Sequence, residues 1–578
     1  MTDNITIPPG SAELAVINAD IYTADKAMPR CSAVAVKDGI IAARGTTEEI
    51  LRLTGKDTRV IDAGGCTLVP GMVDAHMHPT SGARRRLHSI NLTPEMDKPD
   101  YYREIARHIA ENPDSPHYTG GGLMPEIYDC TMPRKEELDV ICSDKPIIIL
   151  SYDGHTTWVN SKALEAMNIT KDTPDPENGV IYKDLVTGEP TGYLAGSAGA
   201  CAGGIMRCFM PRYGIVQNME GVLYTQEMLL SRGVTGVYDA HIDPDPEYYM
   251  AYENLARAGK LKMTVRGAWF IPRDMGTEED MNALIDRCIE ISGEFRTERF
   301  QVNGFKFLCD QVCEAETAYM CQPYCDRCDG WRGLRIWEDG EMLARIFARI
   351  DAAGFQIHLH QIGDGAAKYA LDALERAREI NGSLKMHHTF AHCQFIAEED
   401  KARMAELGVN ALVAPYWMNT TIYSTMDIPH LGEERASRQY PVGSLMRAGM
   451  NVAVHSDYAV STPDWCDALY GLTQRCLSPR AFDVFYRRIK DATYTLDPDA
   501  PFSESICGPL PARGERISTE AAVDVMTLNG ARAMYVDDIL GSIVPGKRAD
   551  MVLLDNDISK MPCASTGVRL TVCGGEVW

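Results

Sequence analysis

The chain has 578 residues, of which 45% are hydrophobic and 24% charged, and these ordinary globular values exclude a collagen-like or mainly disordered protein. At about 100–200 residues per domain, this length predicts two or three domains. Asp and Glu outnumber Lys and Arg by 81 to 57, and the net charge of −24 argues against nucleic acid and anionic membranes as partners.

The first residues, MTDNITIPPGSAELAV, lack the basic start and apolar stretch of a secretion signal. No run of about 18 apolar residues occurs anywhere in the chain. We therefore expect a cytoplasmic protein whose 18 cysteines are reduced thiols or metal ligands. The expected partner is a small-molecule substrate, without nucleic acid or membrane, and a homodimer is left open.

Residues 13–70 alternate apolar and polar positions in short pieces separated by Gly or Asp, as in ELAVINADIYT and AVAVKDGIIAARG. This pattern predicts antiparallel β-structure. Residues 541–578 have the same pattern, from GSIVPGKRADMVLLDNDI to VRLTVCGGEVW. We predict one composite β-sandwich, built from residues 1–67 and 539–578.

Between these ends, eight short apolar runs alternate with helix-like or loop segments: CTLVPGMVDAHMH, GVTGVYDAH, KMTVRGAWF, GFKFLCD, FQIHLHQIGD, MHHTFAHCQ, VNALVAPYW and NVAVHSD. The alternation predicts an α/β fold, and eight repeats predict a (β/α)8 TIM barrel. The first strand is placed within 68–91. The next run follows about 155 residues later, too far for one crossover, so 92–215 is predicted to be an inserted or lid domain and 216–538 the remainder of the barrel.

Nine of the 14 histidines lie at or near the carboxyl ends of these runs, which form the active-site face of barrel enzymes. His76 and His78 are two residues apart on a strand, so both point to one side and can hold one ion. His360 ends the fifth run and His392 ends the sixth. Imidazoles suit zinc and similar divalent metals, so we expect ligation by all four, with core packing as the alternative.

Asp457 ends the eighth run and is expected to face these histidines. There it can bind metal and accept the proton of an attacking water, whereas the alternative is a helix cap. Lys306 lies inside the fourth run, where an unpaired ammonium is costly to bury. The residues leave two explanations open, a carbamylated lysine that bridges two metals or an ion pair with an acidic neighbour such as Asp310.

Four further histidines are less clearly assigned by their positions. His358 shares a face with His360 but lies one layer deeper, so we expect a structural role for it. His241, His388 and His455 are left between the site and the core, and His388 is also a candidate substrate contact.

Strings that span nearly the whole chain resemble the N-substituted formamide deformylase-like branch of the metal-dependent amidohydrolases. They include LVPGMVDAHMH (68–78), DGHTTWVNSKAL (153–164), GFKF (304–307), GFQIHLHQIGD (354–364), HSD (455–457) and GSIVPGKRADMVLLD (541–555). The resemblance implies a small β-sandwich from the chain ends, a lid that contains the candidate substrate contact His155, and carbamylation of Lys306. It also implies a set of metal-site residues: His76, His78, His360, His392 and Asp457.

Four positions depart from the pattern of that family. Ala391 stands where Glu is usual, Gln311 where Gly is usual, Gly196 where an acidic residue is usual, and Ala459 where Pro is usual. The metal-site residues are all present, but the pocket is expected to be altered.

A cysteine cluster follows the fourth run. Cys321, Cys325 and Cys328 have the C-x3-C-x2-C spacing that holds an iron–sulfur cluster in radical enzymes, with Cys309 and Cys313 nearby. A structural zinc knuckle and free thiols are the alternatives. Free thiols are favoured, because radical enzymes carry the motif near the first barrel strand and their chemistry leaves the histidines unexplained.

The expected protein is a metal-dependent hydrolase with one or two divalent ions, zinc first among them, that cleaves a C–N bond of an amide, formamide or cyclic amide. Asp457 is expected to act as general base and then as general acid. Ester or lactone hydrolysis suits the same residues. A barrel that only binds a ligand is disfavoured, because the five principal ligand positions and the lysine are present.

Overall fold

The computed structural model describes most of the chain. The described residues are 7–93, 96–124, 128, 132–151, 156–176, 179–196, 198, 213–273, 275, 277–313, 316–419, 422–482, 510, 513–558 and 566–578. The chain divides into two compact units. The first comprises Met1–Pro79, Val222–Phe482 and Phe502–Trp578, and the second comprises Thr80–Gly221 and Asp483–Pro501.

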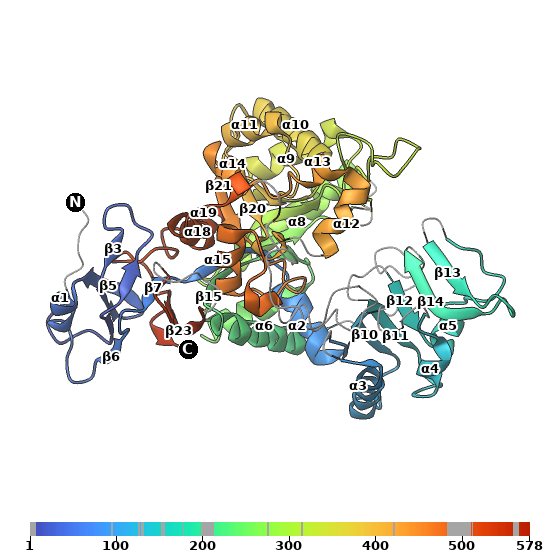
Figure 1. Ribbon diagram of the computed structural model, residues 1–578, viewed down its shortest axis with the longest axis horizontal. Helices are drawn as coiled ribbons and strands as arrows, with labels where there is room; N and C mark the ends of the chain where they lie inside the picture. The colour runs from blue at the N-terminus through green and yellow to red at the C-terminus, as the bar shows by residue number, and fades with distance from the viewer. Residues whose placement is uncertain are drawn as a thin grey trace. The chain divides into compact units, whose positions relative to one another are not determined.

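An eight-stranded parallel sheet forms a nearly closed barrel in the first unit, which confirms the predicted fold class (Figure 1). Each strand pairs with the next barrel strand along the chain. The strands are buried on both faces, as parallel strands covered by helices are, and therefore appear in the sequence as apolar runs. They are β8 (Met72–Met77), β15 (Val234–Ile242), β16 (Thr264–Phe270), β17 (Phe300–Leu308), β18 (Gln356–Gln361), β19 (Thr389–His392), β20 (Asn410–Val413) and β21 (Asn451–Val454).

The first and last barrel strands are joined at their carboxyl ends. The backbone N–H of Asp457 donates to the carbonyl of His76 at 3.1 Å, and the N–H of His78 donates to the carbonyl of Tyr458 at 2.6 Å. The fully buried carboxylate of Asp74 accepts the N–H of Ser456 at 3.1 Å. These contacts bring residues that follow β21 against the end of β8.

Amphipathic helices separate the barrel strands. In α9 (Gly340–Ala352), the residues Leu343, Phe347 and Ile350 recur at helical spacing and are buried. This helix begins after Asp339, whose carboxylate accepts the N–H of Met342 at 2.9 Å. The other helices that lie wholly or mainly in this unit are α6 (Ile215–Leu230), α7 (Pro246–Arg257), α8 (Glu278–Glu294), α10 (Asp364–Asn381), α11 (Glu398–Glu406), η4 (Pro415–Trp417), α12 (Ile422–Leu431), α13 (Glu433–Ala436), α14 (Val442–Arg447), α15 (Trp465–Gln474), η5 (Arg513–Glu515), α18 (Thr519–Met526) and α19 (Leu528–Ala533).

The two ends of the chain share a sandwich, as the sequence predicts. A four-stranded sheet has the order β5 (Ile40–Gly45), β4 (Ala33–Lys37), β1 (Leu14–Ile17) and β6 (Arg59–Asp62), with α1 (Thr47–Leu51) after β5. A six-stranded sheet mixes both ends in the order β24 (Glu576–Val577), β23 (Val568–Cys573), β22 (Met551–Leu554), β7 (Thr67–Pro70), β2 (Asp20–Tyr22) and β3 (Arg30–Cys31). Apolar side chains from both sheets form one core, among them Val16, Val34, Leu68 and Leu553.

The run expected to be the first barrel strand is divided between the sandwich and the barrel. Its first half, β7, pairs with β22 and β2 in the sandwich, whereas its second half, β8, enters the barrel. Gly71 connects them. A Cβ at this position would lie 2.2 Å from the hydroxyl oxygen of Thr235, so only glycine fits between the two strands.

The second unit contains a mixed sheet of six strands in the order β13 (Gly179–Lys183), β14 (Pro190–Gly196), β12 (Thr156–Val159), β11 (Ile147–Ser151), β10 (Tyr118–Leu123) and β9 (Ile90–Asn91). Its helices are α2 (Pro79–His88), α3 (Lys98–Glu111), α4 (Lys135–Asp139) and α5 (Ser161–Ala166). Tyr101, Ile147 and Trp158 contribute to its core. The boundaries of 92–215 for an inserted domain remain a prediction.

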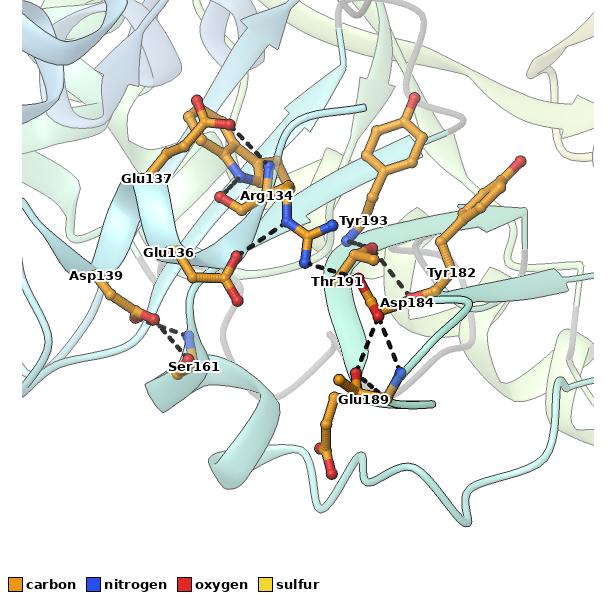
Figure 2. A network of polar contacts seen from close by, with 12 residues as sticks. Arg134, Glu136, Glu137, Asp139, Ser161, Tyr182, Asp184, Glu189, Thr191 and Tyr193 are labelled. Carbon is orange, nitrogen blue, oxygen red and sulfur yellow. Dashed lines mark hydrogen bonds and ion pairs between the residues drawn. The ribbon is translucent and has the colours of Figure 1, made fainter. Parts of the chain in front are cut away.

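Polar contacts connect α4 and Arg134, which precedes it, with α5 and with the segment that follows β13 (Figure 2). The guanidinium of Arg134 lies 3.3 Å from the carboxylates of both Glu136 and Asp184, and Ser161 donates to Asp139 at 2.6 Å. Such exposed ion pairs contribute at most about 1 kcal/mol each. Among the described residues of either unit, no helix has the length and apolar character needed to cross a membrane.

Candidate active site

A cavity of about 140 Å3 lies at the carboxyl ends of the barrel strands. All six residues predicted to hold metal are brought together there: His76, His78, Lys306, His360, His392 and Asp457. Three more residues complete its lining, and these are His241, Phe270 and Leu308. The parallel strands place these side chains together, because each residue lies at the same end of its strand.

Asp457 lies between the two histidines of the first barrel strand. Its Oδ1 atom is 3.2 Å from Nε2 of His76 and 3.1 Å from Nε2 of His78. Asp457 does not cap a helix, since α15 begins after Asp464, whose carboxylate accepts the N–H groups of Cys466 and Asp467. The helix-cap alternative is therefore wrong.

The backbone at two of these residues adopts an unusual conformation. Asp457 has φ of 53° and His392 has φ of 80°, a region that residues with side chains rarely occupy. Such conformations cost about 1–3 kcal/mol each and persist where the surrounding structure imposes them, commonly at functional sites. The strained backbone aims both side chains into the cavity.

The donor atoms in the cavity fit a divalent metal. One atom each from His76, His392 and Asp457 lie within 4.8 Å of one another. Among the described residues, both ring nitrogens of His392, Nε2 of His76 and Oδ1 of Asp457 are buried without a hydrogen bond of acceptable geometry. Buried polar atoms without partners are rare in folded proteins, and imidazole and carboxylate donors are the ligands of zinc and related ions.

The protonation states also suit metal binding. Burial lowers the pKa of His360 to about 4 and the pKa of His76 and His392 well below the usual value. Burial alone would raise the pKa of Asp457, but the imidazoles of His76 and His78 hold this pKa well below its usual range. At neutral pH the imidazoles of His76, His360 and His392 are therefore neutral and the carboxylate is ionised, as metal ligands must be.

Lys306 is 2% exposed and has no ion pair among the residues that the structure describes. Its expected partner Asp310 instead accepts backbone N–H groups from Ile362, Gly363 and Tyr319 at 2.7–3.0 Å. The ion-pair alternative is therefore wrong. Burial lowers the pKa of Lys306 to about 7, so a neutral and nucleophilic amine is present near neutral pH.

The histidines left open by the sequence occupy different places. His241 lines the cavity and stacks on Phe270 with ring centroids 4.0 Å apart. His455 is fully buried, and its ring centroid lies 4.9 Å from that of His392. His358 lies below the cavity, as expected from its deeper position.

The predicted substrate contact His388 is not brought to the cavity. It precedes β19, whereas His392 ends this strand, so the two histidines lie at opposite ends of the barrel wall. Its Nδ1 accepts the N–H of Ile357, and its Nε2 lies 3.4 Å from Asp351. His388 therefore has a structural position. The other candidate, His155, lies outside the described residues.

The cysteine cluster does not form a metal site in the described residues. Among the described residues, two groups of three potential metal ligands converge. One group lies in the cavity, and the other consists of Glu316, Asp326 and His430. Neither group includes Cys321, Cys325 or Cys328. The thiols are not in disulfides, which fits the favoured interpretation of free thiols, and Arg435 donates to the sulfur of Cys325 at 3.1 Å.

Some contributors to the site were missed by sequence reasoning. Phe270 and Leu308 carry no catalytic group, and only their places at the ends of β16 and β17 could have indicated a pocket wall. The ring of Trp417 stacks on His392 with centroids 5.8 Å apart. Asp74 precedes His76 and His78 within GMVDAHMH. An acidic residue inside this apolar run could have indicated the contact that closes the barrel.

Two of the four departures from the family pattern can be placed relative to the cavity. Ala391 packs in the core with Ala75 and Ala453, and its side chain is not part of the cavity lining. Gln311 approaches His360 through its main-chain carbonyl, which lies 3.3 Å from Nε2. Neither side chain lines the cavity, and the expected alteration of the pocket stays a prediction.

Comparisons with known proteins agree with this geometry. Residues 59–578 match the amidohydrolase family. The N-substituted formamide deformylase of Arthrobacter pascens is 26% identical over 575 residues, which cover 96% of this chain and 95% of that protein. Protein LONG AFTER FAR-RED 3 of Arabidopsis thaliana is 26% identical over 585 residues, which cover 99% and 93%. An uncharacterized metal-dependent hydrolase from Pyrococcus horikoshii OT3 shares the fold, with a TM-score of 0.70, 21% identity and coverage of 96% and 99%.

Proposed function

Since the chain belongs to the amidohydrolase family, we propose that it is a metal-dependent hydrolase that cleaves a C–N bond of a small amide, formamide or cyclic amide. The convergence of His76, His392 and Asp457 on one point of a buried cavity carries this proposal. The relative named as a formamide deformylase supports the choice of C–N bonds.

His76, His78, His392 and Asp457 would hold the metal together with His360, whose ring centroid lies 4.4 Å from that of His392. A divalent ion such as zinc would supply Lewis acidity toward the substrate carbonyl and acidify water. The Asp457 carboxylate is ionised at neutral pH and is the oxygen base nearest to the two histidines. One ion or two would be held, depending on the state of Lys306.

In the proposed reaction, Asp457 accepts a proton as water oxygen bonds to the carbonyl carbon. The same carboxyl group then delivers this proton to the leaving nitrogen as the C–N bond breaks, which regenerates the carboxylate. Phe270 and Leu308 contribute apolar side chains to the cavity lining. An ester or lactone would undergo the same sequence with an oxygen leaving group.

Wild-type protein should therefore contain bound transition metal and hydrolyse members of a panel of N-substituted formamides, cyclic amides and matched esters. Removal of metal with a chelator should abolish turnover, and zinc should restore it in proportion to the metal bound. Full activity of the metal-free protein would contradict the proposal. Turnover of esters alone would favour the second candidate function.

We further propose that Lys306 is carbamylated and supplies a bridging carboxylate. The nitrogen of its neutral amine bonds to the carbon of CO2 and releases a proton to water, which converts the uncharged amine into an anionic carbamate beside the metal-site histidines. Two observations on Lys306 support this modification. It has no ion-pair partner among the described residues, and the residue is only 2% exposed.

The Lys306→Ala variant should lose most of its turnover and part of its metal, and formate or acetate should partly restore both by entering the vacated space. Lys306→Met is a matched control, because methionine fills the volume and should prevent rescue. Turnover and metal content are measured with increasing acid concentration. Normal metal and turnover in the alanine variant would contradict a bridging role.

A further inference from the structure

His358 lies directly behind the first histidine of the metal site. It belongs to β18, two residues before His360, and is 1% exposed. It does not line the cavity. Its Nε2 atom is 2.7 Å from Nδ1 of His76, and the two ring centroids are 4.9 Å apart. This buried contact gives the Nδ1 atom of His76 a partner, whereas its Nε2 atom faces Asp457 in the cavity.

The position of one proton follows from this contact. A hydrogen bond between two imidazole nitrogens needs one N–H donor and one lone pair. Nε2 of His76 faces Asp457 at 3.2 Å, on the side where the metal would bind. A neutral imidazole that offers the Nε2 lone pair to a metal carries its proton on Nδ1. His76 is then the donor, and Nε2 of His358 is the acceptor.

The surroundings of His358 hold its ring in place. Tyr238 stacks on it with centroids 4.8 Å apart and an angle of 12° between the planes. A Cβ on Gly304 would lie only 2.3 Å from the hydroxyl oxygen of Tyr238, so the glycine of the GFKF string leaves room for this ring. His358 also pairs in register with Lys306 on the adjacent strand.

The contact gives the Nδ1–H of His76 an acceptor but leaves a polar atom of His358 without a partner. With its Nε2 as acceptor, its own proton lies on Nδ1, and this atom has no hydrogen-bond partner among the described residues. A buried polar group without a partner costs about 1–3 kcal/mol. An apolar side chain would avoid this cost, so stability alone does not explain a histidine at this position.

We propose that His358 is a positioning residue that accepts the Nδ1–H of His76 and thereby holds the Nε2 lone pair toward the metal. The inference rests on the proposed function, because it takes His76 as a metal ligand. Hydrogen bonds of this kind orient ligand histidines, and their loss commonly weakens metal affinity by about 10- to 100-fold.

Two variants of similar size distinguish the role of His358 as a hydrogen-bond acceptor from its role in packing. His358→Gln retains an acceptor oxygen, whereas His358→Leu fills the space without one. The zinc dissociation constant, measured by competition with a chelator, should rise about 10- to 100-fold in the leucine variant and should stay within a few-fold of wild type in the glutamine variant. The melting temperature of the metal-free leucine variant should be unchanged or higher. His388→Leu is the control for removal of a buried histidine away from the cavity.

A spectroscopic signature reports the bond itself. In cobalt-loaded protein, the proton NMR signal of the His76 Nδ1–H should be strongly shifted by the paramagnetic ion and slow to exchange with solvent. It should persist in His358→Gln and be lost or exchange rapidly in His358→Leu. Equal zinc affinity in all three proteins, or equal weakening in both variants, would overturn the inference. Failure of wild type to bind zinc or cobalt would instead contradict the proposed function.

Discussion

Replacement of Asp457 by asparagine should lower kcat by about 10²- to 10⁴-fold, because the amide cannot accept the proton of the attacking water. The substitution preserves the size of the side chain, and the histidines should retain much of the metal. Turnover per bound metal is therefore the decisive measurement. A variant that binds full metal and turns over within a few-fold of wild type would show that another group is the base.

Asp464→Asn is a matched control for this variant. Asp464 lies seven residues further along the chain and caps α15, but it does not line the cavity. Asparagine also caps helices, so the control should change stability by less than about 1 kcal/mol and leave kcat near normal. Comparison of the two melting curves separates the structural role of an acid in this segment from the proton transfer assigned to Asp457.

The double variant His76→Ala and His78→Ala should lose both metal and turnover. These side chains supply two of the imidazoles that surround Asp457, and the remaining donors leave an incomplete coordination shell. Metal content by elemental analysis and turnover with added zinc would measure the effect. Loss of turnover with full metal content would place the two histidines in another role.

His387→Ala provides the control for the double variant. This histidine is exposed and its Nδ1 contacts the carbonyl of Gly408, away from the cavity lining. Its replacement should leave the metal content and kcat unchanged. A similar loss of metal in the control would indicate that the alanine substitutions act through general destabilisation.

The barrel and most of the site were predictable because they depend on local periodicity. Buried parallel strands give apolar runs, and His76 with His78 show the two-residue spacing of one strand face. The position of each residue at the end of a run then brings distant parts of the chain together. Asp457 and Lys306 followed from this rule without any knowledge of side-chain contacts.

Other features depend on contacts that periodicity does not encode. In the run that contains His388 and His392, no residue type indicates where the strand begins. The structure begins β19 at Thr389, and this boundary places the two histidines at opposite ends of the strand. The hydrogen-bond donors to Asp310 were also missed. They are three backbone N–H groups, which every residue type except proline carries, so the sequence does not indicate them. The His76 and His358 contact joins strands that are far apart in the sequence.

The composite sandwich sets an order of events during synthesis. β7 pairs with β22 through Leu68 and Leu553, and all the barrel strands lie between them in the chain. A ribosome that adds about 5–20 residues per second needs roughly 25 to 100 s to pass from one strand to the other. During this interval an unpaired edge of β7 remains next to the first barrel strand, with only Gly71 between them. The pairing of β7 with β22 inside the six-stranded sheet therefore forms only after nearly the whole chain has been made, and a nascent chain must keep that edge from pairing with another molecule until β22 emerges.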